Sequence, residues 1–500
     1  MKWLGYLFGA VAVVAIGLFI FVKVYVGSVN MPYGESEADL NTIQSRLVVP
    51  DGFSVGVYGK VPNARVLRFS RGGHLLVANP NNGQITVMQP DANGDGATDG
   101  VSVLIDQLNG PNGIDFYAGW LYIAETDAIG RIGFDHKTGR TTGEYERLVT
   151  GLPGGGNHWK KTLRFGADNL MYVTMGSSCN VCLEEDQRRA ALVRYLPDGS
   201  GEEIFAEGLR NSAGFDWSPA DGQIYATDNG RDLLGDDFPP CELNQVREGQ
   251  HYGWPYANGA KISDPDFGAG NEAVIEASIA PAFDFQAHNA PLGIEFVRGD
   301  AFPEEYRHSA IVALHGSWNR SSKDGYKVVS LHWDQNGAIT ERDFLTGFLI
   351  DDTTIGRPAE VTQGPDGAFY IADDYANVVY RVAYGEAAQS NNTAVVANIP
   401  VHSLEASFAD LDAEALSSAK AAGEQVYNQF QCVGCHADNN SALKKLENLG
   451  EKYNIPELAG YFKKPTAPMP IFPLSDGQRE NLAIYMLSRY PGGLREGGQE

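Results

Sequence analysis

The sequence predicts an all-β six-bladed β-propeller over residues 45–385, with a small all-α domain after it and one transmembrane helix before it. One pattern recurs six times: a short strand, a turn with Gly or Asp-Gly, and a second strand of apolar and aromatic residues. Strands with clear alternation follow most copies, and such repeats stack radially because a single copy cannot bury its own faces. The copies begin at Val66, Gly113, Thr162, Gly214, Gly293 and Ala359.

The gap between the fourth and fifth copies is wider than the others. It holds an insertion, residues 251–290, that is rich in Gly, Pro and Asn. Insertions of this kind usually overhang the binding face of a propeller. An ordinary β-sandwich is the alternative architecture, and the six repeated copies disfavour it.

The composition excludes nucleic acid as a partner. The chain has 500 residues, of which 43% are hydrophobic, which is enough to build more than one folded core. Its 38 basic and 63 acidic residues give a formal charge of −25. That excess of negative charge repels nucleic acid and anionic lipid.

The N-terminal segment is predicted to be a membrane anchor. Residues 4–26 are almost continuously apolar, with Lys2 before them and an acidic stretch after them. A run of this length spans a bilayer, and the leading basic residue favours an N-terminus on the inner side. We therefore expect residues 1–30 to hold the chain in a bacterial inner membrane, as a single pass, with the catalytic domains in the periplasm. A cleaved signal peptide is the alternative, and it also exports the rest of the chain.

A haem-binding segment lies near the C-terminus. Residues 386–409 are small and polar and predict a linker, and helical periodicity follows over residues 410–492. Within it stands CVGCH, in which Cys432 and Cys435 bind haem c covalently and His436 ligates the iron. This segment predicts a small cytochrome c domain.

Met469 is the expected sixth ligand of the haem iron. It lies in KKPTAPMPIF, where prolines favour an extended loop between two helices. Met486 is the other candidate, but it has Leu-like spacing in a terminal helix that begins near Ser475. A methionine packed in a core is the structural alternative. Gly423, Tyr427 and Tyr485 are expected to let the first and last helices cross closely.

The remaining cysteines indicate an oxidising compartment. Cys179 and Cys182, in SSCNVC, are spaced for a small disulfide, and Cys241 is left over. A redox-active CxxC would need a thioredoxin-like βαβ context, and a zinc site would need a second ligand pair, neither of which the sequence offers. The pair is therefore predicted to be a structural bridge.

A cytochrome domain passes single electrons, so the propeller is predicted to supply them as a dehydrogenase. Several motifs carry a resemblance in support: GGNHWKKTLRFG, GLRNSAG, TDNGRD, HYGWPY and GRPAEV. In this order, over nearly all of residues 50–385, they resemble the pyrroloquinoline quinone (PQQ) dependent sugar dehydrogenases, in particular the sorbosone and pyranose dehydrogenase group. A fused cytochrome c also occurs in that group. The resemblance implies PQQ, Ca²⁺ and haem c as cofactors, and a sugar or aldehyde as substrate.

The resemblance also implies roles for particular residues. His158 matches the general base, and imidazole suits the removal of a hydroxyl proton near neutral pH. Asn157 is expected to orient it, and Arg210 and Asn211 match a pair beside the quinone carbonyls. Arg357 matches a residue that binds the carboxylates of the cofactor, and Arg320 or Lys323 is expected to supply the second positive charge.

The calcium positions follow from the same resemblance. The backbone carbonyls of Gly230 and Arg231 match the catalytic Ca²⁺ site, and Glu242 and Tyr252 match a second one. The loop Asp91–Asp99 has oxygen ligands at the spacing of a calcium loop but lacks the closing acid, so a plain turn is an equal alternative. His288 and His315 are expected either at the substrate mouth or as ordinary core histidines.

The leading hypothesis is an enzyme that oxidises a sugar or a related alcohol or aldehyde at PQQ and sends electrons through its own haem to a respiratory acceptor. A calcium-dependent lactonase of the six-bladed kind is a second hypothesis. A non-catalytic electron carrier whose propeller only docks a partner is a third.

Overall fold

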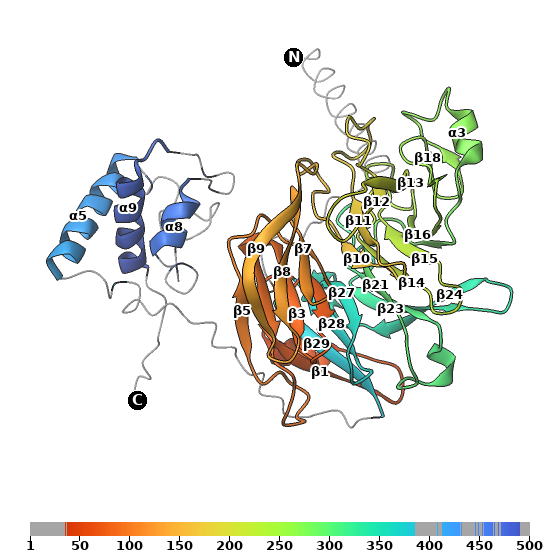
Figure 1. Ribbon diagram of the computed structural model, residues 1–500, viewed down its shortest axis with the longest axis horizontal. Coiled ribbons are helices and arrows are strands. Elements are labelled where there is room, and N and C mark those ends of the chain that lie inside the picture. The colour runs from red at the N-terminus through yellow and green to blue at the C-terminus, as the bar shows by residue number, and fades with distance from the viewer. Residues whose placement is uncertain are drawn as a thin grey trace, which may run out of the picture. The chain divides into compact units, whose positions relative to one another are not determined.

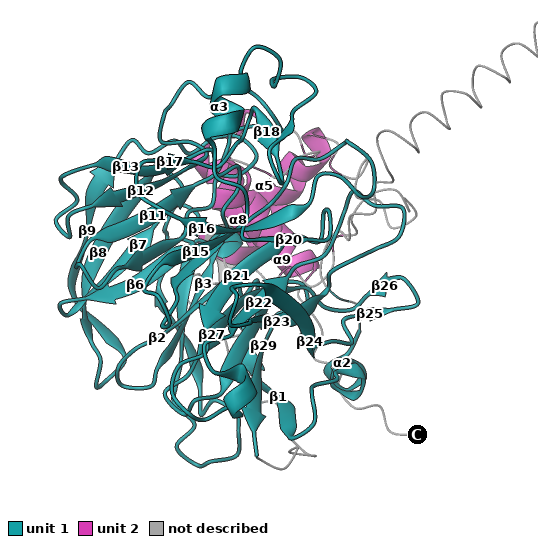
Figure 2. Ribbon diagram, turned by 90° about the vertical axis from the view of Figure 1, so that its right-hand side faces the viewer, with its two compact units in different colours: residues 1–397 teal, residues 398–500 magenta. Residues whose placement is uncertain are grey.

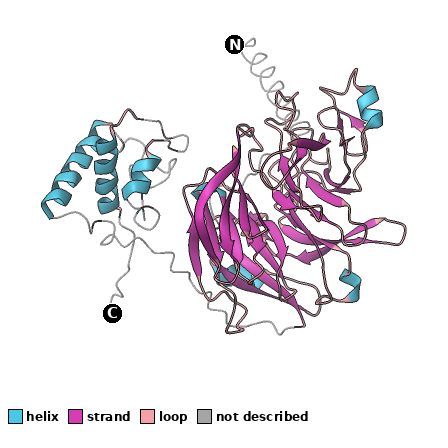
Figure 3. Cartoon of the chain, viewed as in Figure 1, coloured by secondary structure: helices cyan, strands magenta, loops and turns pink. Residues whose placement is uncertain are grey.

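The computed structural model describes Ser36 and residues 38–385, and in the C-terminal part residues 408, 413–430, 432, 446, 449, 453, 455–463, 465, 469 and 472–490. Two compact units divide the chain, Met1–Ala397 and Asn398–Glu500 (Figure 2). The first is built almost entirely from strands, whereas the second contains helices (Figure 3). The predicted division into an all-β part and an all-α part is confirmed.

The first unit is a propeller of six blades (Figure 1). The first blade contains β2 (Val66–Phe69), β3 (Leu75–Asn79), β4 (Gln84–Met88) and β5 (Val101–Ile105). The second contains β6 (Gly113–Tyr117), β7 (Trp120–Ala124), β8 (Ala128–Asp135) and β9 (Arg140–Thr150). The third contains β10 (Leu163–Phe165), β11 (Met171–Met175), β12 (Ala191–Tyr195) and β13 (Glu203–Glu207), with β17 (Gln250–His251) added in parallel.

The other three blades follow the same antiparallel pattern. The fourth contains β14 (Gly214–Trp217), β15 (Ile224–Asp228), β16 (Cys241–Val246) and β20 (Phe283–Phe285). The fifth contains β21 (Pro291–Phe296), β22 (Ala310–Leu314), β23 (Lys327–Trp333) and β24 (Ile339–Leu345). The sixth contains β27 (Pro358–Gln363), β28 (Phe369–Asp373), β29 (Val378–Tyr384) and β1 (Phe53–Lys60).

The six predicted copies are the six inner blade strands with their neighbours. Each predicted start lies within two residues of β2, β6, β10, β14, β21 or β27. The second strand of each blade is buried along its whole length, except at Trp120 at the start of β7, whereas the outer strand β9 is mostly exposed. This gradient from the hub to the rim explains why the inner pairs of strands carried the strongest apolar pattern.

The sixth blade closes the ring. Strand β1, from the N-terminal side of the domain, pairs antiparallel with β29, from Phe53 opposite Tyr384 to Lys60 opposite Val378. Closure in this way joins the N-terminal and C-terminal ends of the domain within one blade and covers the edge of β29. The repeat pattern did not identify β1, because it belongs to a blade whose other strands lie more than 300 residues further along the chain.

Glycines let the inner strands approach one another at the hub. A Cβ at Gly214 would lie 2.3 Å from the Leu292 carbonyl oxygen. A Cβ at Gly293 would lie 2.2 Å from Oε1 of Glu360. The strands β14, β21 and β27 can therefore pack this closely only without side chains at these two positions.

The predicted insertion is only in part an overhang. Its residues form the small hairpin β18 (Ala257–Asn258) and β19 (Ile262–Ser263) and the helix α3 (Glu272–Ala277), which extend from the blades in Figure 1. However, β20 (Phe283–Phe285) pairs with β16 and completes the fourth blade, so treating all of residues 251–290 as an overhang was wrong at its C-terminal end. The remaining short elements are α2 (Leu40–Arg46), the turns Pro80–Asn82 and Glu304–Tyr306, and the hairpin β25 (Leu349–Ile350) and β26 (Thr353–Thr354).

The second unit contains the helices α5 (Ala413–Gln429), α8 (Ile455–Tyr461) and α9 (Asp476–Arg489). Ser475 caps α9 through a capping box with Gln478, as the predicted start near Ser475 requires. A Cβ at Gly423 would lie 2.0 Å from the Asn481 carbonyl oxygen, and the rings of Tyr427 and Tyr485 lie 5.5 Å apart. The predicted close crossing of the first and last helices is confirmed.

In the described part of the chain, no helix combines the length and apolar character that a bilayer crossing requires. The predicted anchor, residues 1–30, lies outside the described residues, as does most of the linker 386–409.

Candidate active site

A cavity of about 210 Å³ lies at one end of the propeller hub. Residues at the starts of the inner strands form part of its lining, among them Val66, Asn112, Thr162, Ala213 and Leu292. The loop before β10 contributes four consecutive residues, 157–160. Because each blade contributes its inner strand to the same ring, residues far apart in sequence meet here.

His158 lines this cavity, as the resemblance implied. Its Nδ1 lies 3.0 Å from the carbonyl oxygen of Ser177 and 2.8 Å from Oγ of the same residue. The carbonyl only accepts, and the Ser177 hydroxyl already donates to the Cys179 carbonyl oxygen at 2.8 Å. Both neighbours of Nδ1 are therefore acceptors, so Nδ1 carries the proton and Nε2 keeps its lone pair.

The charge state of His158 suits a base. Burial lowers its pKa from the ordinary 6.5 to about 3, and the nearby guanidinium of Arg210 acts in the same direction. The imidazole is therefore neutral at pH 7, with an unprotonated nitrogen available to accept a proton. A proton accepted here is held weakly, so it passes readily to another group.

Arg210 lies behind the cavity wall. It is buried, and all five of its N–H groups have protein acceptors. Nε and Nη2 donate to the backbone oxygen and Oδ1 of Asn180, at 2.9 and 2.8 Å, and Nη2 also donates to Asp232 at 3.2 Å. Nη1 donates to the carbonyl oxygens of Asn229 and Gly230, at 2.9 Å each. Its guanidinium is thus fixed in position beside the residues that line the cavity.

A disulfide loop connects the base to Arg210. Cys179 and Cys182 form the predicted disulfide, and Asn180, the main partner of Arg210, lies between them. Ser177, two residues before Cys179, accepts a hydrogen bond from Nδ1 of His158 through its carbonyl oxygen. Its own N–H donates to the Arg210 carbonyl oxygen at 2.8 Å. One short segment therefore positions both predicted catalytic side chains.

Asn211 and Asn157 also line the cavity. The backbone N–H of Asn211 donates to Oδ1 of Asp228 at 2.5 Å, which fixes the residue at the start of the fourth blade. Asn112 adds an amide that was not predicted: its Nδ2 donates to the Lys161 carbonyl oxygen at 3.0 Å, while its buried Oδ1 has no hydrogen-bond partner. An unsatisfied buried acceptor in a cavity wall indicates a place for a ligand donor or a water.

Basic side chains gather at the same cavity. Arg65 and Lys160 line it, although neither was predicted. Arg65 pairs with Asp374 at 2.5 Å, and His315 lies 2.8 Å from the same carboxylate. Burial, together with the charges of Arg65 and Arg357, lowers the pKa of Lys160 to about 7. Lys160 has no hydrogen bond or ion pair with any other residue that the structure describes.

Arg357 adjoins this group. Its Nε and Nη2 donate to the carbonyl oxygens of His315 and Gly316, at 3.1 and 3.3 Å. The other two candidates for the second charge point elsewhere. Arg320 pairs with Asp237 at 3.2 Å and donates to the Asp236 carbonyl oxygen, and Lys323 donates to the Asp352 carbonyl oxygen at 2.6 Å. Arg65 and Lys160, which precede inner strands, line the cavity, whereas Arg320 and Lys323 are not among its lining residues.

The predicted catalytic calcium site lies at the turn after β15. Its Gly230 carbonyl accepts from Arg210, and the side chain of Arg231 pairs with Asp264 at 2.8 Å, which ties the turn to the insertion. Asp228 and Glu242 face each other across β15 and β16. Burial raises the pKa of Asp228 to about 7 and that of Glu242 to about 8. Buried carboxyl and carbonyl oxygen atoms are the kind of donor that Ca²⁺ prefers.

The second predicted calcium pair is not assembled through its side chains. Glu242 accepts from Asn244 at 3.0 Å and from the Gly259 N–H at 2.9 Å. The Tyr252 hydroxyl instead donates to the Gln245 carbonyl oxygen at 2.7 Å. In the loop Asp91–Asp99, Asp91 accepts from three backbone N–H groups of its own turn, which is the arrangement of a self-capped turn.

The two other histidines differ in position. His315 belongs to the basic group beside the cavity, whereas the Nε2 of His288 lies 2.8 Å from the Gly235 carbonyl oxygen and the residue is buried. His288 is therefore a satisfied interior histidine.

Residues 61–381 match a protein-family model described as glucose/sorbosone dehydrogenase. The chain belongs to this family. Membership accounts for the propeller but does not cover the C-terminal helices. The hub cavity lies in a propeller of the glucose/sorbosone dehydrogenase family, and we therefore take this cavity as the candidate active site.

Individual relatives agree with the family. An uncharacterised protein of Borreliella burgdorferi is 32% identical over 68% of this chain and 92% of its own length. A pyrroloquinoline quinone-dependent pyranose dehydrogenase of Coprinopsis cinerea is 26% identical over 56% of this chain, and the match spans 44% of that protein.

Solved structures share the fold. The holo form of the PQQ domain of the Coprinopsis cinerea pyranose dehydrogenase superposes with a TM-score of 0.58 at 21% identity, over 67% of this chain and 97% of that domain. A calcium structure of a Trichoderma reesei carbohydrate-active enzyme of family AA12 superposes with a TM-score of 0.59 at 20% identity, over 71% and 99%. At these identities the likeness establishes the six-bladed fold.

The haem ligands stay predictions. Cys432 and Met469 are described, and both pack against the hydrophobic core of the C-terminal unit. Cys435 and His436 lie outside the described residues.

Proposed function

We propose that this chain is a PQQ- and calcium-dependent dehydrogenase that oxidises a sugar or a related alcohol or aldehyde. The observation that carries the proposal is the position of His158: a neutral imidazole in the hub cavity, with Nδ1 held by acceptors and Nε2 without a partner among the described residues. Such a group removes the hydroxyl proton as hydride leaves the adjacent carbon. Family membership supplies the reaction class.

The lining of the cavity supports PQQ as the cofactor. PQQ is planar and carries several carboxylates and two quinone carbonyls. Arg65 and Lys160 supply positive charge, and Asn112, Asn157 and Asn211 supply amides that hydrogen-bond carbonyl and carboxylate oxygen. Arg357 adds charge beside Arg65. When bound, PQQ provides the two-electron acceptor that no amino-acid side chain can provide.

We propose that Ca²⁺ would be held by the backbone carbonyls of Gly230 and Arg231. The buried carboxyl groups of Asp228 and Glu242 lie in the same region and carry raised pKa values, so a cation there favours their ionised forms. When bound, the ion would polarise oxygen atoms of the cofactor as a Lewis acid.

Electrons are proposed to leave through a haem c held by Cys432, Cys435, His436 and Met469, and to pass to a respiratory acceptor. The support is the CVGCH segment together with the packing of Cys432 and Met469 against one helical core. A bacterial inner-membrane anchor at residues 1–30, with the catalytic part in the periplasm, accords with the disulfide at Cys179 and Cys182.

The test is reduction of the haem by substrate. The purified full chain, supplied with PQQ and Ca²⁺, is mixed with a panel of sugars and aldehydes while the haem absorbance is followed. At least one substrate is expected to reduce the haem. Replacement His158→Ala should lower the rate by about a thousandfold without preventing PQQ binding, because general base catalysis contributes roughly 10²–10⁴.

The control is His332→Gln, which changes a histidine of the outer fifth blade that bonds the Glu305 carbonyl oxygen. It should leave the rate unchanged. Lactone hydrolysis that needs calcium but never reduces the haem would contradict the proposal and favour a hydrolase. Equal rates for His158→Ala and the wild type would remove His158 from the reaction.

A further inference from the structure

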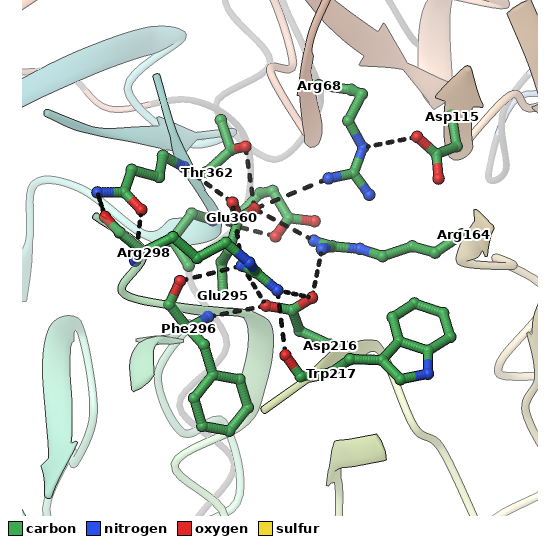
Figure 4. Close-up of polar contacts among 12 residues, drawn as sticks. Arg68, Asp115, Arg164, Asp216, Trp217, Glu295, Phe296, Arg298, Glu360 and Thr362 are labelled. Atoms are coloured by element: carbon green, nitrogen blue, oxygen red, sulfur yellow. Dashed lines mark hydrogen bonds and ion pairs between the residues drawn. The ribbon is translucent and has the colours of Figure 1, made fainter. Parts of the chain in front are cut away.

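Charged side chains from the inner strands of several blades converge in one cluster (Figure 4). We call it the charged belt, and its members are Arg68, Asp115, Arg164, Asp216, Glu295 and Arg298. Five of them lie on inner strands, each from a different blade, and Arg298 follows the fifth inner strand directly. On β2, β10 and β21 the belt residue comes two or three positions after a residue that lines the cavity, so the strands run from the cavity into the belt.

The belt is a connected network of ion pairs. Arg68 lies 3.3 Å from Asp115 and 3.8 Å from Glu295, which joins three blades. Arg164 lies 3.4 Å from Asp216 and 3.6 Å from Glu295. Arg298 donates to both oxygens of Asp216, at 2.9 and 3.0 Å. The side chain of Arg298 is 43% exposed, so the network ends at solvent.

Glu360 lies between the cavity and the belt. It lines the cavity, it is only 3% exposed, and Figure 4 shows it among the belt side chains. Its Oε1 accepts from the Val361 N–H at 3.1 Å. Among the described residues, no ammonium or guanidinium group forms an ion pair with it.

The groups around Glu360 include one more carboxyl group than guanidinium groups. The belt contains three guanidinium groups, and with Glu360 the same region contains four carboxyl groups. The region is neutral when one carboxyl group is protonated. The three belt carboxylates have guanidinium partners, whereas Glu360 has none among the described residues, so the proton belongs on Glu360.

The electrostatic surroundings agree with this assignment. Burial raises the pKa of Glu360 to about 7 and Glu295 acts in the same direction, while Arg164 and Arg68 oppose them. Across the cavity, the charged or titratable groups are Arg65, His158 and Lys160. Glu360 can therefore take up and release a proton near neutral pH.

The inference rests on the proposed function, because the reaction determines what must leave the cavity. Oxidation of a carbinol to a carbonyl breaks one C–H and one O–H bond. With PQQ bound, the quinone would take the hydride equivalent, and Nε2 of His158 would take the hydroxyl proton. Transfer of the two electrons one at a time to a haem would also release the proton of the hydride equivalent. Each turnover would therefore send two electrons and two protons out of the hub.

We propose that Glu360 is the residue through which these protons leave the cavity, and that the charged belt conducts them towards the solvent-exposed end at Arg298. His158 holds a proton weakly, and Glu360 shares its cavity and adjoins a polar network that reaches water. Electrons and protons would then leave the cavity by different routes: the electrons through the cofactor, and the protons along the hub.

The first test needs no cofactor. A protonated buried carboxyl group has an infrared C=O stretch that is distinct from the amide bands. The purified full chain should show absorption of this kind, to which Asp228 and Glu242 also contribute because their pKa values are raised. Glu360→Gln should remove one component, with a midpoint near pH 7 in a pH titration, from the difference spectrum. Glu341→Gln, at a half-buried glutamate of β24 paired with Lys327, is the matched control and should keep it. If Glu360→Gln removes no band, the proposal is overturned.

The second test measures proton release during turnover with a pH-indicator dye. Glu360→Gln should slow proton release by about tenfold or more, whereas Glu360→Asp should restore release in part. Equal release rates for the wild type and Glu360→Gln would overturn the proposal. If no cofactor binds, the proposed function fails, and the infrared titration still decides whether Glu360 holds the proton. If Glu360→Gln does not fold, the infrared titration is done with Glu360→Asp. A shift of the carboxylic acid band in that variant would show that Glu360 holds the proton, and an unshifted band would overturn the proposal.

Discussion

The cavity end and the belt end of the hub are built from the same inner strands, but they differ in whether their buried polar groups have partners. In the belt, Asp216 has two guanidinium partners and also accepts from the Phe296 N–H at 2.8 Å. At the cavity, Lys160, Nε2 of His158 and Oδ1 of Asn112 have no polar partner in the part of the chain that the structure describes. A buried polar group without a partner costs roughly 1–3 kcal/mol. The belt therefore stabilises the ring, and the cavity keeps its groups for a ligand.

The largest effect should come from breaking the belt. Asp216→Asn removes the charge that binds Arg164 and Arg298 and leaves buried guanidinium charge uncompensated. The free energy of unfolding should fall by about 3–5 kcal/mol. Chemical denaturation of the wild type and the variant measures it. Glu146→Gln, which breaks the surface pair with Arg131, should cost less than about 1 kcal/mol, and equal losses in the two variants would contradict a structural role for the belt.

A smaller effect is expected at the cavity wall, where Arg210 is fully paired. Asn180→Ala removes the amide oxygen that accepts from Arg210 at 2.8 Å and from the Asp232 N–H at 2.8 Å. A lost bond to a charged group corresponds to roughly 1.5–3 kcal/mol. Without this bond the guanidinium of Arg210 is no longer fixed beside the cavity, and PQQ affinity should fall by up to about ten- to a hundredfold. Calorimetric titration of the full chain with PQQ measures it.

Asn336→Ala, in an exposed turn of the fifth blade, is the control for this change. Reduction of the Cys179–Cys182 disulfide should shift affinity in the same direction as Asn180→Ala, because the loop that holds Asn180 is then open. Unchanged affinity in both experiments would show that the position of Arg210 does not depend on this loop.

The smallest effect concerns the unpaired Lys160. Its pKa is lowered to about 7, so it is charged below that pH and neutral above it. Attraction of an anionic cofactor should weaken as pH rises through about 7, and Lys160→Met should bind PQQ about tenfold more weakly at pH 6 but like the wild type at pH 8. Lys327→Met, at a paired surface lysine, should keep the pH dependence. A variant that loses affinity equally at both values would show that the ammonium charge is not the cause.

Local patterns in the chain were sufficient for several features. The repeated strand pairs predicted the six blades because each inner pair is buried and has the same local composition. The spacing of Cys179 and Cys182 predicted their bridge, and the start of the last helix at Ser475 follows from its capping residues. Each of these depends on residues close together in sequence.

The sequence by itself thus determined the blades, the disulfide and the position of His158 before the third inner strand. Only the tertiary structure decided which charges share the hub. Arg65, Lys160 and Glu360 come from the first, third and sixth blades, and nothing local distinguishes them from residues outside the cavity lining, such as Arg320. Radial packing brings together the starts of strands that are hundreds of residues apart, so the composition of the cavity is a property of ring closure, which includes the pairing of β1 with β29.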